Sequence, residues 1–321
     1  MRTRVLWENA NWQTNLERTS PLSQRMAEST GPNPITHFFS VDVEEYFQVS
    51  AFERHVARES WTTYPDRLLG SMDWILDALG RRSMSGTFFT LGWIAQHRPG
   101  IVRRIADAGH EVASHGFWHR RVTTMTPDEF REDVRTSKDL LEQLSGKRVL
   151  GFRAPTFSIV PGHEWALEIL AEEGYIYDSS LFPVARSGYG YPNITPAPHR
   201  FMLPNGETIL ELPMTMARVL GAGIPASGGG WFRQFPYAIT HLAFAQRSRA
   251  GVPAMFYIHP WEIDPSQPRM QVSWLTRMRH YRGLDSTRDR LNRLLDEFNF
   301  TSVEREIEHL LALSSPAGAV V

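Results

Sequence analysis

The chain has 321 residues, 42% of them hydrophobic and 21% charged, with a formal net charge of −1 at pH 7. This composition predicts a folded protein with a sizeable core, and the near-zero charge argues against a nucleic-acid binder that relies on a basic surface. The absence of cysteine excludes disulfides, thiolate metal sites and cysteine nucleophiles, so any metal must take nitrogen and oxygen ligands.

The two ends of the chain are predicted to be tails. Residues 1–34 are polar and rich in Ser, Thr, Asn and Gln, and residues 314–321 are mostly small. The N-terminus lacks the apolar segment of a signal peptide, and no stretch approaches the roughly 20 apolar residues of a membrane span. We therefore expect a cytoplasmic protein that is not an integral membrane protein, with export by another route left open.

Between the tails, strand-like apolar runs alternate with helical patterns. Strands are expected at 35–43, 86–91, 111–114, 149–152, 176–180, 208–213 and 253–259. Helices are expected at 66–79, 95–108, 126–144, 163–173 and 236–249, and residues 187–204 have the composition of a loop. No Gly/Ser linker divides the chain, so the alternation predicts one α/β domain with a parallel, barrel-like sheet.

Chemically capable side chains follow several of the predicted strands. They are Asp42 and Glu44, His115 and His119, Arg153, Asp178 and His259. In a parallel barrel the carboxyl ends of the strands share one face, and that face is where such folds place their chemistry. Taken singly, each group has a structural alternative, such as acids at a helix N-terminus. Their joint position at strand ends favours a common site.

The spacing of His115 and His119 suggests a metal site. If the chain turns into a helix after strand 111–114, both rings lie on one face of its first turn and reach one cation, although such pairs also occur by chance. A catalytic zinc site needs three protein ligands and an open position, which the two histidines and one carboxylate supply. Metal-assisted hydrolysis of an amide or ester would use three further groups. They are a second carboxylate as the base, an arginine beside it and a third histidine as the acid.

Eight segments in one order resemble the NodB-homology polysaccharide deacetylases, a carbohydrate esterase family of the type numbered four. They are FSVDVEEYFQV, GTFFTLGW, GHEVASHGFWH, GFRAPTFSI, YDSSLFP, GGGWFR, FYIHPWEID and LDEFNFTSV. More narrowly, the chain resembles the subfamily found with exopolysaccharide and exosortase loci. The resemblance implies a distorted (β/α)7-type barrel over residues 35–264 with a helical C-terminal extension, residues 265–313, packed on it.

The resemblance also implies an activity and its residues. The activity is removal of N-acetyl groups from amino sugars of a polysaccharide or its lipid-linked precursor, in exopolysaccharide biosynthesis. By position, Asp42 matches the family's catalytic base, Arg153 the arginine that supports it, and His259 the acid. The amide of Thr156 matches a contributor to the oxyanion site, and Asp178 lies in the segment that orients the catalytic histidine.

One departure from the family pattern concerns the metal. The two histidines match the family's metal histidines, and Zn²⁺ or another divalent transition metal is the implied cofactor. The family's first motif has two adjacent aspartates, whereas this chain has Asp42-Val43-Glu44. Since alternate residues of an extended chain share a face, Glu44 is the expected carboxylate ligand, with Asp42 and Glu45 as alternatives.

Other residues near the motifs are candidates for substrate binding. Trp231 and Trp261 offer broad faces on which a sugar ring can stack, with core packing as the alternative. Glu262 either adds to the site or pairs with an arginine. The arginines within 277–293 form a solvated helical face, or else contact an acidic polymer or a membrane surface.

The expected partners are an N-acetylated glycan and an exopolysaccharide synthesis or export apparatus, with no nucleic acid. Two other functions remain open at this point. One is hydrolysis of a small cyclic amide, as in allantoinase-like relatives of the same fold with altered first motifs. The other is polysaccharide binding without turnover, which gains nothing from an intact set of catalytic residues.

Overall fold

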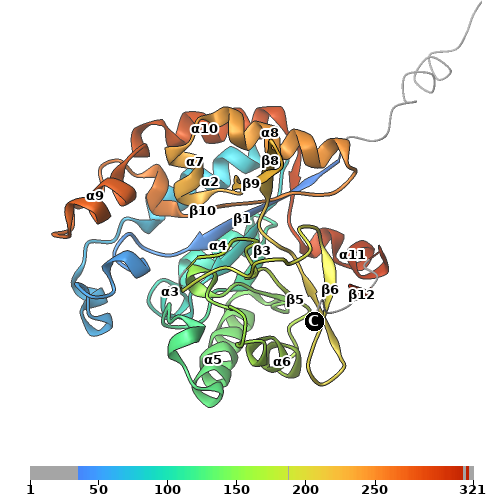
Figure 1. Cartoon of the computed structure of the whole chain (residues 1–321). Coiled ribbons are helices and arrows are strands. Elements are labelled where there is room, and N and C mark those ends of the chain that lie inside the picture. Colours follow the sequence, from blue (N-terminus) through green and yellow to red (C-terminus); the bar gives the residue numbers. More distant parts are fainter. Residues whose placement is uncertain (1–34, 187, 314–315, 318–321) are drawn as a thin grey trace, which may run out of the picture. The chain divides into compact units, whose positions relative to one another are not determined.

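The computed structural model describes residues 35–186, 188–313 and 316–317 (Figure 1). Its main sheet has the strand order β10-β1-β2-β3-β4-β5-β7-β6-β12, and β11 pairs with the start of β1. The strands are β1 (His37–Val43), β2 (Thr87–Thr90), β3 (Glu111–Ser114), β4 (Gly151–Phe152), β5 (Tyr177–Asp178), β6 (His199–Met202), β7 (Thr208–Glu211), β10 (Met255–Ile258), β11 (Phe300–Thr301) and β12 (Pro316–Ala317). A separate hairpin pairs β8 (Met216–Val219) with β9 (Ala222–Pro225).

Seven neighbouring strands of the sheet, from β10 through β1 to β7, run parallel to one another. Within the described residues no ladder joins β10 to the far edge of the sheet, so the curled sheet is an open half-barrel. The predicted barrel of the (β/α)7 type is therefore confirmed, and the carboxyl ends of its strands lie together at one edge. The predicted tails, residues 1–34 and 314–321, lie outside the described residues except for β12.

Helices and short 3-10 turns connect the strands. The helices are α2 (Leu68–Gly80), α3 (Gly92–His97), α4 (Pro99–Asp107), α5 (Pro127–Ser145), α6 (Trp165–Glu172), α7 (Gly229–Gln234), α8 (Tyr237–Arg249), α9 (Trp274–Tyr281), α10 (Leu284–Glu297) and α11 (Ile307–Leu313). The 3-10 turns are η1 (Ser50–Phe52), η2 (Arg58–Thr63), η3 (Val122–Thr124), η4 (Pro155–Phe157), η5 (Pro260–Ile263) and η6 (Glu304–Glu306). Helices α4 and α5 pack against β3, and α6 packs against β7.

Alternation along β1 divides the core into two clusters. Phe39, Val41 and Val43 belong to the large cluster that the helices complete, whereas Phe38 belongs to a second cluster inside the curled sheet. Every residue of β1 is buried, as expected for a parallel strand covered on both faces. Ser40 and Asp42 therefore lie on the same side as Phe38, inside the curl of the sheet.

Two predicted elements differ from the structure. The single helix expected at 95–108 is two helices, α3 and α4, because Arg98 is non-helical (φ −137°, ψ 54°). A proline disfavours the helical conformation at the residue before it, and Pro99 then begins α4 at a position where proline is tolerated. The loop expected at 187–204 contains β6, which pairs antiparallel with β7.

The C-terminal segment completes the same domain. Helix α10 packs against η5 and α7, and β11 pairs with the first residues of β1. The backbone amides of Ser302 and Val303 donate to the hydroxyls of Ser85 and Thr87, at the amino ends of the parallel strands. Among the described residues, no helix combines the length and the apolar character needed to cross a bilayer.

Candidate active site

Asp42 is held by a buried arginine. The Arg153 guanidinium donates to Asp42 Oδ1 (2.6 Å) and to Ser40 Oγ (2.8 Å), and it also donates to the backbone and side chain of Ser179 (3.2 and 3.0 Å). Arg153 is fully buried, with its guanidinium carbon 4.0 Å from the centre of the Phe89 ring. This many partners fix the orientation of Arg153 and hold its positive charge against Asp42.

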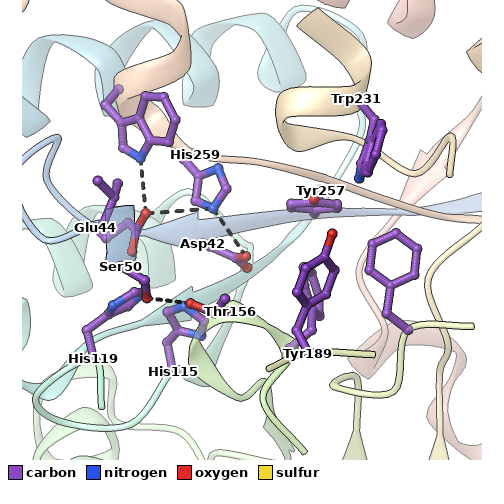
Figure 2. Close-up of a pocket in the computed structure, with 14 residues that line it drawn as sticks. Asp42, Glu44, Ser50, His115, His119, Thr156, Tyr189, Trp231, Tyr257 and His259 are labelled. Carbon is purple, nitrogen blue, oxygen red and sulfur yellow. Dashed lines mark hydrogen bonds and ion pairs between the residues drawn. The ribbon is translucent and has the colours of Figure 1, made fainter. Parts of the chain in front are cut away.

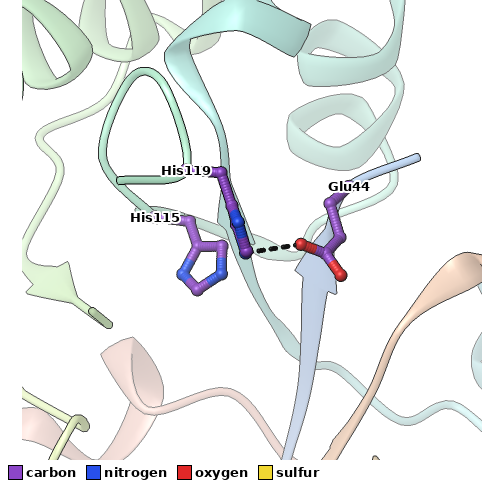
Figure 3. Close-up of side chains that lie close together, drawn as sticks. All are labelled: Glu44, His115 and His119. Carbon is purple, nitrogen blue, oxygen red and sulfur yellow. Dashed lines mark ion pairs between the residues drawn. The ribbon is translucent and has the colours of Figure 1, made fainter. Parts of the chain in front are cut away.

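Glu44, His115 and His119 form a buried group whose ligand atoms all lie within 4.8 Å of one another (Figure 3). The Oε2 atom of Glu44 lies 2.7 Å from Nε2 of His119 and has no hydrogen-bond partner among the described residues. Burial raises the pKa of Glu44, but the facing histidines outweigh this and lower it to about 2. A buried, ionised oxygen without a donor is costly, and a cation shared with the histidines would satisfy it.

The protonation of His115 also fits a metal ligand. Nδ1 of His115 donates to the backbone carbonyl of Arg153 (2.7 Å), which leaves the Nε2 lone pair free. Burial lowers the pKa of His115 to about 4, so the ring is neutral at pH 7, the form that binds metal. The chemistry of this donor set, one carboxylate and two imidazoles, therefore suits a divalent cation.

The two histidines are brought together by a loop, and the predicted helical turn is wrong. Gly116 (φ +72°) and His119 (φ +51°) have left-handed backbone conformations that bend the chain after β3. Asp133 of α5 accepts from the backbone amides of Phe117 (2.7 Å) and Trp118 (3.4 Å). A Cβ at Gly116 would lie 2.7 Å from Oδ2 of Asp133. The sequence reasoning missed Asp133, whose only signal is an acid on the buried face of a predicted helix.

His259 lies across the site from the histidine pair, held by Glu262. Nδ1 of His259 is 2.9 Å from Oε2 of Glu262, whose Oε1 accepts from Arg233 (2.5 Å). Burial lowers the pKa of His259, but the nearby carboxylates, Glu262 foremost, outweigh this and raise it to about 9. Nε2 of His259 lies 3.7 Å from both Asp42 Oδ2 and Glu44 Oε1. Glu262 therefore both contacts the site and pairs with an arginine.

Trp261 lines the pocket but does not offer a free face to a sugar. Its ring stacks between His259 (5.1 Å, 22°) and His280 (4.2 Å, 16°). Its indole N–H donates to Oε1 of Glu44 (3.0 Å). The expectation that a sugar stacks on Trp261 is corrected by this packing, because both faces are already covered, and the residue instead orients Glu44.

Glu45 is not part of the metal group. Its Oε1 accepts from the backbone amides of Arg67 and Leu68 (2.9 and 3.0 Å), at the N-terminus of α2. Burial raises its pKa to about 8. Of the three acids considered for the metal, Glu44 alone faces the two histidines among the described residues, while Asp42 faces Arg153 and Glu45 faces α2.

Asp178 is not placed against His259. It accepts from the amide and hydroxyl of Ser180 (2.8 and 2.6 Å), and the Ser180 hydroxyl accepts from the amide of Ala154 (2.7 Å). Its neighbour on β7 is Glu211, and burial together with the Asp178 charge raises the pKa of Glu211 well above its ordinary value. Asp178 thus supports the chain next to Arg153, and the carboxylate on His259 is Glu262.

An open pocket joins these groups (Figure 2). Its volume is about 220 Å³, and its lining residues are Asp42, Glu44, Val49, Ser50, His115, His119, Thr156, Phe157, Phe182, Tyr189, Trp231, Tyr257, His259 and Trp261. Figure 2 shows Tyr189, Trp231 and Tyr257 on one side of the pocket, away from the histidine pair. The pocket therefore has a charged, metal-capable side and an aromatic side.

Thr156 lies at the pocket in a strained conformation. It has φ +60°, Phe157 follows with φ +53°, and the Thr156 hydroxyl bonds Ser50 (2.5 Å). Residues held in this region of backbone space cluster at functional sites. The Thr156 amide has no hydrogen-bond partner in the part of the chain that the structure describes, as a donor to a substrate oxygen would require.

Comparison with known proteins relates part of the chain to deacetylases. Residues 57–171 match the family model described as polysaccharide deacetylase, and residues 179–308 match a domain of unknown function, DUF3473. A peptidoglycan-N-acetylglucosamine deacetylase of Bacillus cereus is 34% identical over 95 residues, which are 29% of this chain and 34% of that protein. The peptidoglycan-N-acetylmuramic acid deacetylase PdaA of Bacillus subtilis is 30% identical over 74 residues, 23% of this chain and 28% of PdaA.

The matches to these curated relatives thus span about a third of their length. A crystal structure from Mycobacterium smegmatis, provisionally named a polysaccharide deacetylase, shares the fold. It has 18% identity and a TM-score of 0.61, with 91% of this chain and 98% of that chain covered. Residues 57–171 are thus similar to polysaccharide deacetylases, and the chain shares the fold of the Mycobacterium smegmatis protein.

Proposed function

We propose that the protein is a metal-dependent N-deacetylase that acts on amino sugars of a glycan. The observation that carries the proposal is the buried Glu44 oxygen that faces two histidines without a hydrogen bond, beside the Arg153–Asp42 pair and His259. A protein that only binds glycans has no use for a buried carboxylate of this kind, because leaving it without a donor destabilises the fold.

Glu44, Nε2 of His115 and His119 would hold the cation, most simply Zn²⁺. When bound, such a cation lowers the pKa of a water molecule to about 7 and polarises a carbonyl oxygen. Glu44 directly follows β1, and the two histidines lie on the loop after β3, so the pocket side of the group remains available to water and substrate.

Asp42 acts as the general base. Its Oδ1 accepts from Arg153, which leaves Oδ2 toward the pocket and His259. A carboxylate in this position accepts the proton of the attacking water. Arg153 acts through Asp42 and does not line the pocket.

His259 acts as the general acid. The carboxylate of Glu262 favours its protonated form, and Nε2 then carries the proton on the pocket side. When the C–N bond of the acetamido group breaks, this proton goes to the departing sugar amine, and acetate is the second product. We assign the Thr156 amide to the developing oxyanion and Trp231 to the sugar ring.

The proposed substrate is an N-acetylated glycan in exopolysaccharide biosynthesis, free or lipid-linked. Residues 35–264 would form the catalytic barrel, and residues 265–313 an extension that supports η5, the turn directly after His259. Asp178 contributes indirectly, through Ser180 and the chain that carries Arg153.

Acetate release tests the proposal. The purified chain is incubated with a panel of N-acetylated oligosaccharides, including peptidoglycan and exopolysaccharide fragments, before and after removal of metal with a chelator. We expect acetate release from at least one glycan, lost on chelation and restored by Zn²⁺ or Co²⁺. Release from a cyclic amide alone, or no release with a fully metal-loaded protein, would contradict the proposal.

A further inference from the structure

Helix α9 (Trp274–Tyr281) lies at an outer edge of the folded part of the chain (Figure 1). It presents an apolar strip to solvent. Trp274, Leu275 and Met278 are 69%, 59% and 43% exposed. At about 100° per residue these three side chains occupy an arc of roughly 100° on the helix. Exposed tryptophan, leucine and methionine on one helical face are more than the scattered single apolar residues of an ordinary surface.

Arginines border this strip. On the same helical projection, Arg277 and Arg279 lie on the two sides of the apolar arc, and Arg282 follows directly after the helix. None of these three side chains has a carboxylate partner among the described residues, whereas Arg131 and Arg135 on α5 both pair with glutamates. Residues 265–284 contain four arginines and no acid, although the whole chain has a net charge of −1.

The opposite side of α9 is fixed to the pocket wall. His280 is buried, stacks on Trp261 at 4.2 Å and bonds Gln267 (3.0 Å). Its carbonyl accepts from Arg233, the arginine that holds Glu262. Trp261 lines the pocket, so the Trp261 ring alone separates His280 of α9 from the pocket.

We propose that the outer face of α9 docks on the interface of an anionic lipid bilayer. The apolar strip enters the boundary between headgroups and acyl chains, tryptophan lies at headgroup level, and the unpaired arginines contact anionic lipids. An acidic polysaccharide would use the arginines and Trp274, but it gives Leu275 and Met278 no reason to be exposed. The pattern therefore favours a membrane over a soluble polymer.

This docking goes beyond the proposed deacetylase activity and does not depend on it. It is peripheral and reversible, because only one short helix enters the interface. If the activity holds, docking brings the pocket to glycans carried on membrane lipids and leaves hydrolysis of free oligosaccharides unchanged.

Flotation with vesicles tests the docking. The full chain is mixed with vesicles of phosphatidylcholine alone or of phosphatidylcholine and phosphatidylglycerol, and the floating fraction is measured at low and high salt. We expect flotation with the anionic vesicles that falls as salt rises. Arg277→Glu/Arg279→Glu should weaken the partition coefficient by about tenfold or more, since each arginine near an anionic surface contributes about a fivefold factor.

Matched variants separate docking from general effects. Leu275→Ser should reduce flotation, whereas Leu220→Ser, at an exposed leucine in the β8–β9 turn, should not. Arg103→Glu/Arg249→Glu makes the same charge change at two exposed arginines away from α9 and should bind nearly as the wild type does. Equal flotation of the α9 and control variants, or binding to soluble dextran sulfate without flotation, would overturn the proposal. Acetate release from a soluble oligosaccharide, measured in parallel, reports on the deacetylase separately.

Discussion

Two buried carboxylates at opposite ends of the parallel strands have very different surroundings. At the amino end, Glu111 accepts from the Thr87 hydroxyl (2.6 Å), the Tyr177 hydroxyl (2.8 Å) and the Glu304 amide (2.8 Å), so both of its oxygens are satisfied. At the carboxyl end, Oε1 of Glu44 accepts one indole N–H, whereas Oε2 lies 2.7 Å from Nε2 of His119 and has no hydrogen-bond partner among the described residues.

This difference fits a division of roles between the two ends of the sheet, with stability at the amino end and the proposed metal site at the carboxyl end. A buried carboxylate with all its oxygens satisfied closes the bottom of the barrel and fastens the C-terminal segment to it, which serves stability. A buried carboxylate that faces two imidazoles and lacks a hydrogen bond on one oxygen has a cost that folding alone does not recover. Burial alone therefore does not distinguish a functional carboxylate from a structural one. The hydrogen-bond donors around each of its oxygens do.

The largest expected effect on activity is at the carboxyl end of the strands, where Glu44 lies. His119→Ala removes one of three ligands and should lower metal content to background and kcat/KM by at least about 10³-fold. Without metal, the free energy of unfolding of His119→Ala should stay within about 1 kcal/mol of wild type, because the substitution breaks no hydrogen-bond network. Metal analysis, acetate release and urea unfolding check this, with the exposed His241→Ala as control. Full metal content in His119→Ala would remove His119 from the ligand set.

Glu262→Gln should have the next largest effect. Loss of the carboxylate lowers the pKa of His259 from about 9, so the ring loses its proton at a lower pH. We expect kcat to fall by about 10²-fold, and the alkaline limb of the pH profile of kcat/KM to move to lower pH. Metal content should stay at the wild-type level. A profile that keeps its alkaline limb in place would show that His259 is not the acid.

At the amino end of the strands, a substitution should lower stability and leave activity in place. Glu111→Gln brings an amide NH₂ among three donors and should lower the free energy of unfolding by about 1–3 kcal/mol. Activity at a permissive temperature and metal content should remain. Urea unfolding of this variant beside the exposed Glu308→Gln measures the cost. A variant as stable as wild type that loses activity would reverse the roles assigned to the two ends.

Much of this site can be predicted from the sequence, because side chains alternate between the two faces of a strand. The two-residue repeat along β1 predicts that Asp42 and Glu44 share a face, and the strand ends predict that Arg153 and His259 lie near them; the structure shows these contacts. Such features depend on neighbours in sequence and on the parallel topology.

The remaining features depend on partners far along the chain. The loop that joins the two histidines is held by Asp133 on a later helix, and the stacking on Trp261 comes from His280 of the C-terminal segment. The network that satisfies Glu111 includes the amide of Glu304, a distant residue. No local pattern specifies these contacts, which is why the histidine loop and the role of Trp261 were mispredicted.

The central claim is that Glu44 holds the metal while Asp42, two residues before it, takes the proton. Binding of Co²⁺ or Zn²⁺ to Asp42→Asn and Glu44→Gln, measured by titration calorimetry beside acetate release, tests it most directly. Asp42→Asn should bind metal nearly as the wild type does but turn over at least about 10³-fold more slowly, and Glu44→Gln should lose both metal and turnover. Loss of metal from Asp42→Asn with retention in Glu44→Gln would contradict it.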